Sequence, residues 1–270
     1  MNIVRYRHND IISYGLTVGD QVTAPGSIFP GEGATDTGRL FSFLVDAKQA
    51  LSGESSMLPL ADVTLLAPVI PGKIIALGYN YKDLVGERDH YDEPVIFFKP
   101  PSAVTGPGGE IVLREDRKVW TEVELAIVIG KTCRDVTVEE APGHILGHTI
   151  ANDVTMSNCN GRDHHLARSK GWDTFCPIGP AIVTGADTSS LKMTNTINGT
   201  LMQDSSTDKR ILNDAELVSF LSRFFTLDPG DVILTGTPAN AENSVIRHGD
   251  RVAVSIEGLG TLENTVRAEF

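Results

Sequence analysis

The sequence predicts a mostly β protein with small α elements, an α+β fold. Many short runs rich in β-branched residues follow one another, Gly-, Pro- and Asp-rich turns separate them, and only one segment has a convincing helical period. The chain has 270 residues, enough for one large domain and a smaller appendage. We expect a small N-terminal domain over residues 1–68 and a larger domain over residues 69–270, because a proline-marked stretch lies between them.

The elements are expected in a definite order. In the N-terminal domain, strands are predicted at residues 3–6 and 11–16, and the apolar spacing of residues 39–51 predicts a helix. In the larger domain, strands are predicted over residues 74–77, 95–99, 122–129, 148–152, 181–184, 192–197, 232–235 and 251–256. The convincing helix covers residues 214–225, since Asn213 is a suitable N-cap with Glu216 three residues later.

Composition narrows the classes of function. The net charge of −12 argues against a nucleic-acid partner, which needs a basic surface. It does not exclude a small anionic substrate, because a local cation can dominate a site. No apolar run reaches membrane-spanning length, and the three cysteines form no CxxC pair, so we expect a cytoplasmic protein without a disulfide framework or membrane partner.

Glu122 and Glu124 begin the apolar run that ends at Ile129, and they are the most informative feature of the chain. Side chains two residues apart in a strand share a face, so the two carboxylates repel each other and resist burial. Asp153 follows a second apolar stretch and supplies a third carboxylate. Oxygen ligands of this kind suit Mg²⁺ or Mn²⁺. The alternative is a solvated strand edge.

Three further segments are candidates for the site, each with an ordinary alternative. The polar residues 78–92 follow a strand and form either an active-site segment or a surface loop. The turn at residues 235–238 offers hydroxyl and backbone N–H groups that suit a carboxylate, or is a plain turn. Lys170 has the same ambiguity. We interpret residues 163–165, Asp-His-His, as surface because no matching metal-ligand spacing accompanies them.

Together these segments resemble the fumarylacetoacetate hydrolase family, from about residue 65 to the end of the chain. The segments that carry the resemblance are residues 75–81, 97–100, 122–131, 152–155, 173–175, 177–180 and 229–238. The resemblance implies a mixed β-sandwich roll, usually a homodimer, with one Mg²⁺ or Mn²⁺ per subunit. It also implies that the metal ligands are Glu122, Glu124 and Asp153, that Lys170 lies near the metal, and that Thr237 contacts substrate. We further assign substrate binding to Tyr81, Gly236 and Asn160.

The chain departs from the commoner family pattern at the catalytic dyad. Bacterial relatives often carry Asn-Tyr-x-x-His-x-x-Glu, but here Leu84 stands at the histidine position, whereas Glu87 is retained. Fumarylacetoacetase itself has a Tyr-x-Asp followed by a catalytic histidine seven residues after the aspartate, a spacing that Asp83 and His90 reproduce. We therefore expect His90, Glu87 and Lys170 to be catalytic and Asp83 to lie at or near the metal.

A second departure follows Asp153, where the arginine of many relatives is missing, so Arg162 or Arg168 is a candidate for carboxylate recognition. The expected function is metal-dependent hydrolysis of a C–C bond in a β-diketo or acylpyruvate-type 2-oxo acid. The alternative on the same scaffold is an isomerase or decarboxylase of 2-hydroxy-diene-dioates or 2-oxo acids. An alternative of another class, favoured by Leu84, is a catalytically silent binder of metal and 2-oxo acid.

Overall fold

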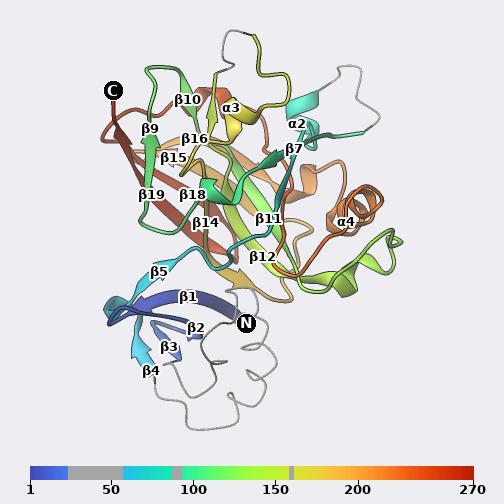
Figure 1. Ribbon diagram of the computed structural model, residues 1–270, viewed down its shortest axis with the longest axis horizontal. Helices are drawn as coiled ribbons and strands as arrows, with labels where there is room; N and C mark the ends of the chain where they lie inside the picture. The colour runs from blue at the N-terminus through green and yellow to red at the C-terminus, as the bar shows by residue number, and fades with distance from the viewer. Residues whose placement is uncertain (24–56, 87–92, 158–160) are drawn as a thin grey trace.

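The computed structural model describes residues 1–23, 57–86, 93–157 and 161–270 (Figure 1). The protein is mostly β, as predicted, and is built from two mixed sheets and a small two-stranded ladder. The helix predicted over residues 39–51 lies outside the described residues. Within the described ranges, no helix is long and apolar enough to cross a membrane.

The larger sheet has 12 strands and joins the N-terminal segment to the rest of the chain. Its main path runs β4 (Met57–Pro59), β3 (Gln21–Thr23), β2 (Ile11–Val18), β1 (Asn2–His8), β14 (Cys176–Val183), β12 (Ile145–Asn152), β11 (Val123–Ile129), β17 (Val232–Leu234), β6 (Ile74–Gly78) and β7 (Val95–Lys99), while β5 (Thr64–Leu66) pairs with β1 and β8 (Val104–Thr105) with β14. β1 pairs antiparallel with β14, so strands on both sides of residue 68 share one sheet. The domain boundary at residue 68 stays a prediction.

The second sheet has five strands and packs against one face of the first. Its order is β16 (Thr200–Ser206), β15 (Lys192–Ile197), β18 (Arg251–Ile256), β19 (Gly260–Ala268) and β9 (Glu110–Leu113), and β10 (Val119–Trp120) pairs separately with β13 (Thr155–Met156). Leu125 and Ile150 of the first sheet share a buried cluster with Met193 and Val254 of the second. This face-to-face packing is the layered sandwich that was expected.

Helix α4 (Asp214–Ser222) covers the same face of the larger sheet as the second sheet, farther along β11, where Leu217 and Leu221 pack against Ile127, two residues from Leu125 (Figure 1). The predicted capping box at Asn213 is confirmed. The helix ends at Ser222 and not at residue 225. The Ser222 carbonyl accepts a hydrogen bond from the Asp135 backbone N–H at 2.9 Å instead of from the next helical turn. The remaining helices are short: α2 (Lys82–Val85), α3 (Ala167–Lys170), and the 3-10 turns η1 (Leu60–Asp62), η2 (Pro101–Ala103), η3 (Ala141–His144), η4 (Thr207–Lys209) and η5 (Ala241–Asn243).

Every predicted strand is present, three of them with the predicted ends: β7, β15 and β18. Among the strands of four residues or more, β9, β16 and β19 were missed, and so were the shorter strands β3, β4, β5, β8, β10 and β13. Strands β16 and β19 alternate exposed polar with buried residues along an open sheet face, so they lack the continuous apolar run that marks a buried strand.

Candidate metal centre

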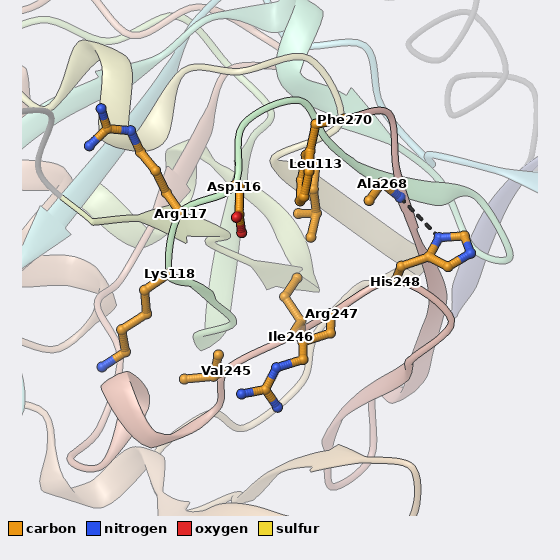
Figure 2. Close-up of a pocket in the computed structure, with 10 residues that line it drawn as sticks. All are labelled: Leu113, Asp116, Arg117, Lys118, Val245, Ile246, Arg247, His248, Ala268 and Phe270. Carbon is orange, nitrogen blue, oxygen red and sulfur yellow. Dashed lines mark hydrogen bonds between the residues drawn. The ribbon is translucent and has the colours of Figure 1, made fainter.

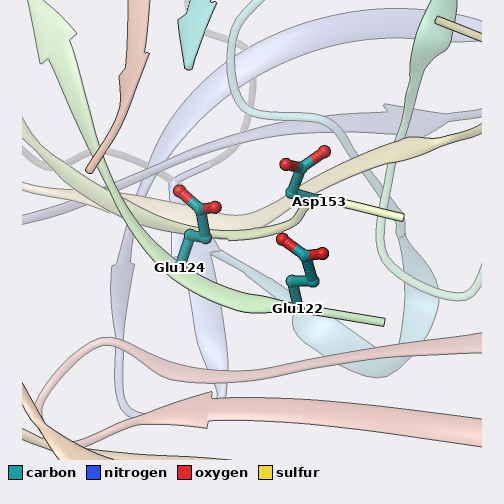
Figure 3. A group of neighbouring side chains, drawn as sticks. All are labelled: Glu122, Glu124 and Asp153. Carbon is teal, nitrogen blue, oxygen red and sulfur yellow. The ribbon is translucent and has the colours of Figure 1, made fainter. Parts of the chain in front are cut away.

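Three carboxylates meet where strands β11 and β12 lie side by side. Glu122 directly precedes β11, Glu124 lies within it, and Asp153 directly follows β12. The antiparallel register pairs Val123 with Asn152, which brings the start of one strand to the end of the other. One ligand oxygen from each acid lies within 4.8 Å of the other two, and Figure 3 shows the three carboxylates converging. The two strands therefore build the triad predicted from their end residues.

The triad is buried. The exposed fractions are 8% for Glu122, 1% for Glu124 and 0% for Asp153, so the solvated strand edge is wrong. Burying a carboxylate is costly unless a cation or hydrogen-bond donors compensate it. The question is what compensates three of them together.

Two buried lysines supply part of the compensation. Lys170 Nζ lies 3.0 Å from Glu122 Oε2 and 2.6 Å from Asp153 Oδ2. Lys99 Nζ lies 2.5 Å from Asp153 Oδ1 and donates to the backbone carbonyl of Lys170 at the same distance. Lys99 ends β7 and received no role from the sequence, although a lysine that closes an apolar strand was a usable signal. Two ammonium groups against three carboxylates leave one negative charge without a cation.

The pKa values follow this arrangement. Burial, and then the charges of Asp153 and Glu122, raise the pKa of Glu124 well above its usual range. Burial acts the same way on Asp153, but Lys170 and Lys99 outweigh it and lower the pKa of that carboxyl. The neighbouring carboxylates outweigh burial at Lys170 and raise its pKa, so its ammonium keeps its proton. Of the two carboxyls with a shifted pKa, Asp153 is therefore compensated by the lysines, and Glu124 is the carboxyl that lacks a compensating cation.

Glu122 and Glu124 also receive neutral donors. The Trp120 indole N–H and the Thr155 hydroxyl donate to Glu122 Oε1 at 2.7 and 2.8 Å. The Gly236 backbone N–H donates to Glu124 Oε2 at 2.7 Å. Gly236 has a φ of 97°. The backbone can adopt this angle because glycine has no Cβ.

The predicted turn at residues 235–238 lies beside the triad. The Thr237 hydroxyl donates to the Val123 carbonyl at 3.1 Å, and the side chain of Asn80 donates to the Thr235 carbonyl at 2.8 Å. Val123 stands between the two glutamates in sequence. The structure therefore brings Gly236 and Thr237 together with the triad.

Other predicted residues are placed elsewhere. The Tyr81 hydroxyl is buried and donates to the Met193 sulfur at 3.0 Å, in the core between the sheets. Asp83 is not in the carboxylate group: its Oδ2 accepts from the Ser205 hydroxyl at 2.8 Å and lies 3.4 Å from Lys209 Nζ. Leu84 packs against the same core. Three predicted site residues lie outside the described residues: His90, Glu87 and Asn160.

The segment before Lys170 differs in part from its interpretation as surface. His164 and His165 are exposed, but Asp163 is buried and accepts from the backbone N–H groups of Arg168 and Ser169 at 3.1 and 2.5 Å. Asp163 thereby holds the short helix α3 that presents Lys170. Arg162 and Arg168, the candidates for carboxylate recognition, are exposed.

A cavity of about 810 Å³ lies apart from this centre and is lined by none of the three carboxylates. Its walls are the segment from Leu113 to Lys118, the segment from Val245 to His248, and the C-terminal residues Ala268 and Phe270. Figure 2 shows the Phe270 ring beside Leu113, and the Ala268 N–H donating to His248 Nδ1 at 3.1 Å. We assign this cavity no part in the chemistry.

Comparison with known proteins agrees with the geometry. Residues 73–267 match the model of the fumarylacetoacetate (FAA) hydrolase C-terminal domain, and residues 1–68 match the Rv2993c-like N-terminal model. A mitochondrial oxaloacetate tautomerase of Bos taurus is 40% identical over 81% of this chain and 74% of its own length.

Two solved structures cover 100% of both chains. A 5-carboxymethyl-2-hydroxymuconate delta-isomerase of Mycobacterium smegmatis is 37% identical, with a TM-score of 0.83. A maleylpyruvate hydrolase of a Sphingobium species, solved with manganese(II) and pyruvate, is 30% identical, with a TM-score of 0.84. The family model covers most of the chain, and members of the family are enzymes that include hydrolases, isomerases and tautomerases. The chain therefore belongs to the fumarylacetoacetate hydrolase family.

Proposed function

We propose that this protein is a divalent-metal-dependent enzyme that moves a proton on a small 2-oxo acid, as an isomerase or tautomerase. The observation that carries the proposal is the buried acidic triad with one more carboxylate than it has lysines. Such a cluster is stable only with another positive charge or a bound proton. A metal ion supplies that charge and also gives the site its chemistry.

The donor set fits Mg²⁺ or Mn²⁺. All three candidate ligands, Glu122, Glu124 and Asp153, are hard oxygen donors, and three protein ligands leave positions for water or substrate. Glu124 is the donor whose pKa burial and its neighbours raise, so it gains most from a cation. A metal bound here would act as a Lewis acid that stabilises enolate character on the carbonyl oxygen of a 2-oxo acid.

The chain's own residues orient and balance this centre. Lys99 holds one oxygen of Asp153 and Lys170 the other, which fixes the plane of that carboxylate. In our proposal Lys170, whose pKa the neighbouring carboxylates raise in the metal-free protein, adds positive charge beside a developing oxyanion. The base remains a prediction, with His90 and Glu87 as the candidates.

The relatives support two reactions, proton transfer and C–C hydrolysis, and both pass through enolate character on the substrate. The tautomerase and the delta-isomerase, at 40% and 37% identity, favour proton transfer. The maleylpyruvate hydrolase, solved with manganese(II) and pyruvate, favours the C–C hydrolysis first expected from the sequence, which we keep as the second candidate. Decarboxylation and silent binding stay predictions. So do the homodimer, the anionic substrate and the cytoplasmic location.

An ultraviolet assay separates these reactions. Oxaloacetate enol and an acylpyruvate would each be followed with Mg²⁺ or Mn²⁺ and with a chelator. We expect metal-dependent loss of the oxaloacetate enol signal without cleavage. Metal-dependent loss of the acylpyruvate diketone signal, with pyruvate formed, would instead favour the hydrolase. If neither compound turned over while oxalate still raised the melting temperature, the silent binder would replace both. No stability change with metal would contradict the metal centre itself.

A further inference from the structure

Gln203, on strand β16, touches both the strand that carries the two glutamates and the turn that carries Thr237. We infer that Gln203 is a positioning residue that couples these two parts of the centre and thereby sets the affinity of the metal-loaded site for a carboxylate ligand. The inference rests on the proposed function and names the part of the chain that orients its substrate. Among the described residues, Gln203 makes no hydrogen bond to the carboxylates of the candidate metal ligands.

The oxygen of the Gln203 amide holds the strand. Oε1 accepts from the Val123 backbone N–H at 3.2 Å and from Asn195 Nδ2 at 3.1 Å. Because strand side chains alternate in direction, the Val123 side chain and the glutamates beside it point to opposite faces. Gln203 thus fixes the backbone between the two glutamates.

The nitrogen of the same amide holds the turn. Nε2 donates to Thr237 Oγ1 at 3.1 Å and to the Pro238 carbonyl at 3.0 Å, and a third acceptor, the Ala239 carbonyl, lies at 3.3 Å. The amide is 1% exposed, so water competes little for these contacts. The Gln203 amide therefore bridges turn and strand through one planar group, next to the direct bond from the Thr235 N–H to the Leu125 carbonyl at 3.0 Å.

The Thr237 hydroxyl closes this link. Because it accepts from Gln203, it directs its own proton to the Val123 carbonyl at 3.1 Å. A substrate carboxylate needs donors, and the proton of this hydroxyl is already used. The Thr235 and Gly236 N–H groups donate to the Leu125 carbonyl and to Glu124, and Pro238 has no N–H, so the turn offers a ligand the backbone N–H of Thr237, whose position Gln203 helps to fix.

Gln203→Glu separates the contact of the amide oxygen with the strand from the contacts of the amide nitrogen with the turn. The change keeps an oxygen to accept from Val123 but replaces the donor nitrogen with an oxygen that faces a hydroxyl and two carbonyl groups. Asn195→Asp is the comparison variant: it disturbs the strand half of the same network, because Asn195 Nδ2 donates to Gln203 Oε1, and it leaves the contacts with the turn in place. Asn195 is 0% exposed and belongs to the same network, but it donates to the Thr121 carbonyl and hydroxyl at 3.2 and 2.9 Å and does not touch the turn.

The experiment measures two affinities by calorimetry on the full chain: Mn²⁺ for the metal-free protein, and oxalate for the Mn²⁺-loaded protein. For Gln203→Glu we expect the Kd of Mn²⁺ to stay within about threefold and the Kd of oxalate to rise about tenfold. For Asn195→Asp we expect the two Kd values to change by the same factor. If Gln203→Glu does not fold, Gln203→Met replaces it, with oxalate affinity again falling more than Mn²⁺ affinity.

Equal changes in both affinities for the Gln203 variant, or a lowered melting temperature with the oxalate Kd unchanged, would show a merely structural amide and overturn the inference. Failure of the unsubstituted protein to bind Mn²⁺ or oxalate is a different result. It would overturn the proposed function, and this inference with it.

Discussion

Two buried charged clusters lie along strand β12, one just past its end and one at its middle, and they are balanced differently. At one end, Asp153 and two glutamates face two lysines. At the middle of the strand, His148 Nε2 lies 3.0 Å from Asp214 Oδ2, and Asp214 also pairs with Arg210 and accepts from the Thr188 hydroxyl at 2.5 Å. The first cluster has a carboxylate in excess, and the second has a cation for its single carboxylate.

The pKa directions express this difference. At Asp214 burial is outweighed by His148 and Arg210, so the pKa of the carboxyl falls below its usual range, whereas at Glu124 it rises. A balanced cluster is complete within the chain and holds elements together, here β12 and the start of α4. An unbalanced cluster is completed only by a proton or by something from outside. Burial alone therefore does not distinguish a site from a structural network, but charge balance does.

The largest expected effect tests the balanced cluster. Asp214→Ala leaves Arg210 and His148 buried without their partner, and breaking such a pair costs about 3–5 kcal/mol of unfolding free energy. Urea unfolding of the metal-free protein measures this, with exposed Asp208→Ala as the control that changes little. Mn²⁺ affinity of the folded variant should be unchanged. If it fell as well, the two clusters would not be independent.

The next effect tests the unbalanced cluster. Glu124→Gln keeps the shape of the side chain and removes the charge that lacks a cation, so we expect metal affinity to fall about 100-fold. The metal-free variant should be at least as stable as the parent, because a neutral amide avoids the repulsion from Asp153 and Glu122. Calorimetry with Mn²⁺ measures the metal affinity, and urea unfolding measures the stability of the metal-free variant. Glu139→Gln, at an exposed position, is the control for both. A strongly destabilised metal-free variant would mean that Glu124 is already compensated.

The smallest effect is the pH dependence of the metal-free protein. Because its folded-state pKa is raised, Glu124 keeps a proton that the unfolded chain loses, so its stabilising contribution is complete below the unfolded pKa and is lost as pH rises through the folded pKa. One proton limits the slope to about 1.4 kcal/mol per pH unit. Unfolding measured across this range in chelator should show the decline, and Glu124→Gln should show less of it.

Asp214 behaves in the opposite sense. Its pKa is lowered, so its contribution is present above the unfolded pKa and is lost only as pH falls through the folded pKa. The decline described for Glu124 should therefore persist in the Asp214→Ala background. If the decline were absent in the Asp214→Ala variant, it would come from the cluster around Asp214 and not from Glu124.

The sequence predicted the β class, the strands of the core and the acidic triad, because each depends on local pattern: apolar runs, turn residues, and carboxylates at strand ends. It did not predict that Lys99 and Gln203 belong to the centre. Lys99 reaches Asp153 across 54 positions, and Gln203 reaches Val123 across 80. Such contacts depend on strand order and register, which no short pattern contains. The position of Asp83 was likewise not predictable in detail: it contacts Ser205, Lys209 and the Ala239 N–H directly after the turn, and its expected place at or near the metal stays a prediction.

The pairing of β1 with β14 has a consequence for protein engineering. Asn2 and Ile3 lie opposite Val183 and Ile182, so the N-terminal strands cap an edge of the large sheet. A truncation that began at residue 69 would leave unpaired N–H and carbonyl groups along that edge, a template on which other chains can add strands and aggregate. The N-terminal segment is thus a poor candidate for deletion or exchange as a module, and fusion partners are better attached at the exposed C-terminal Phe270.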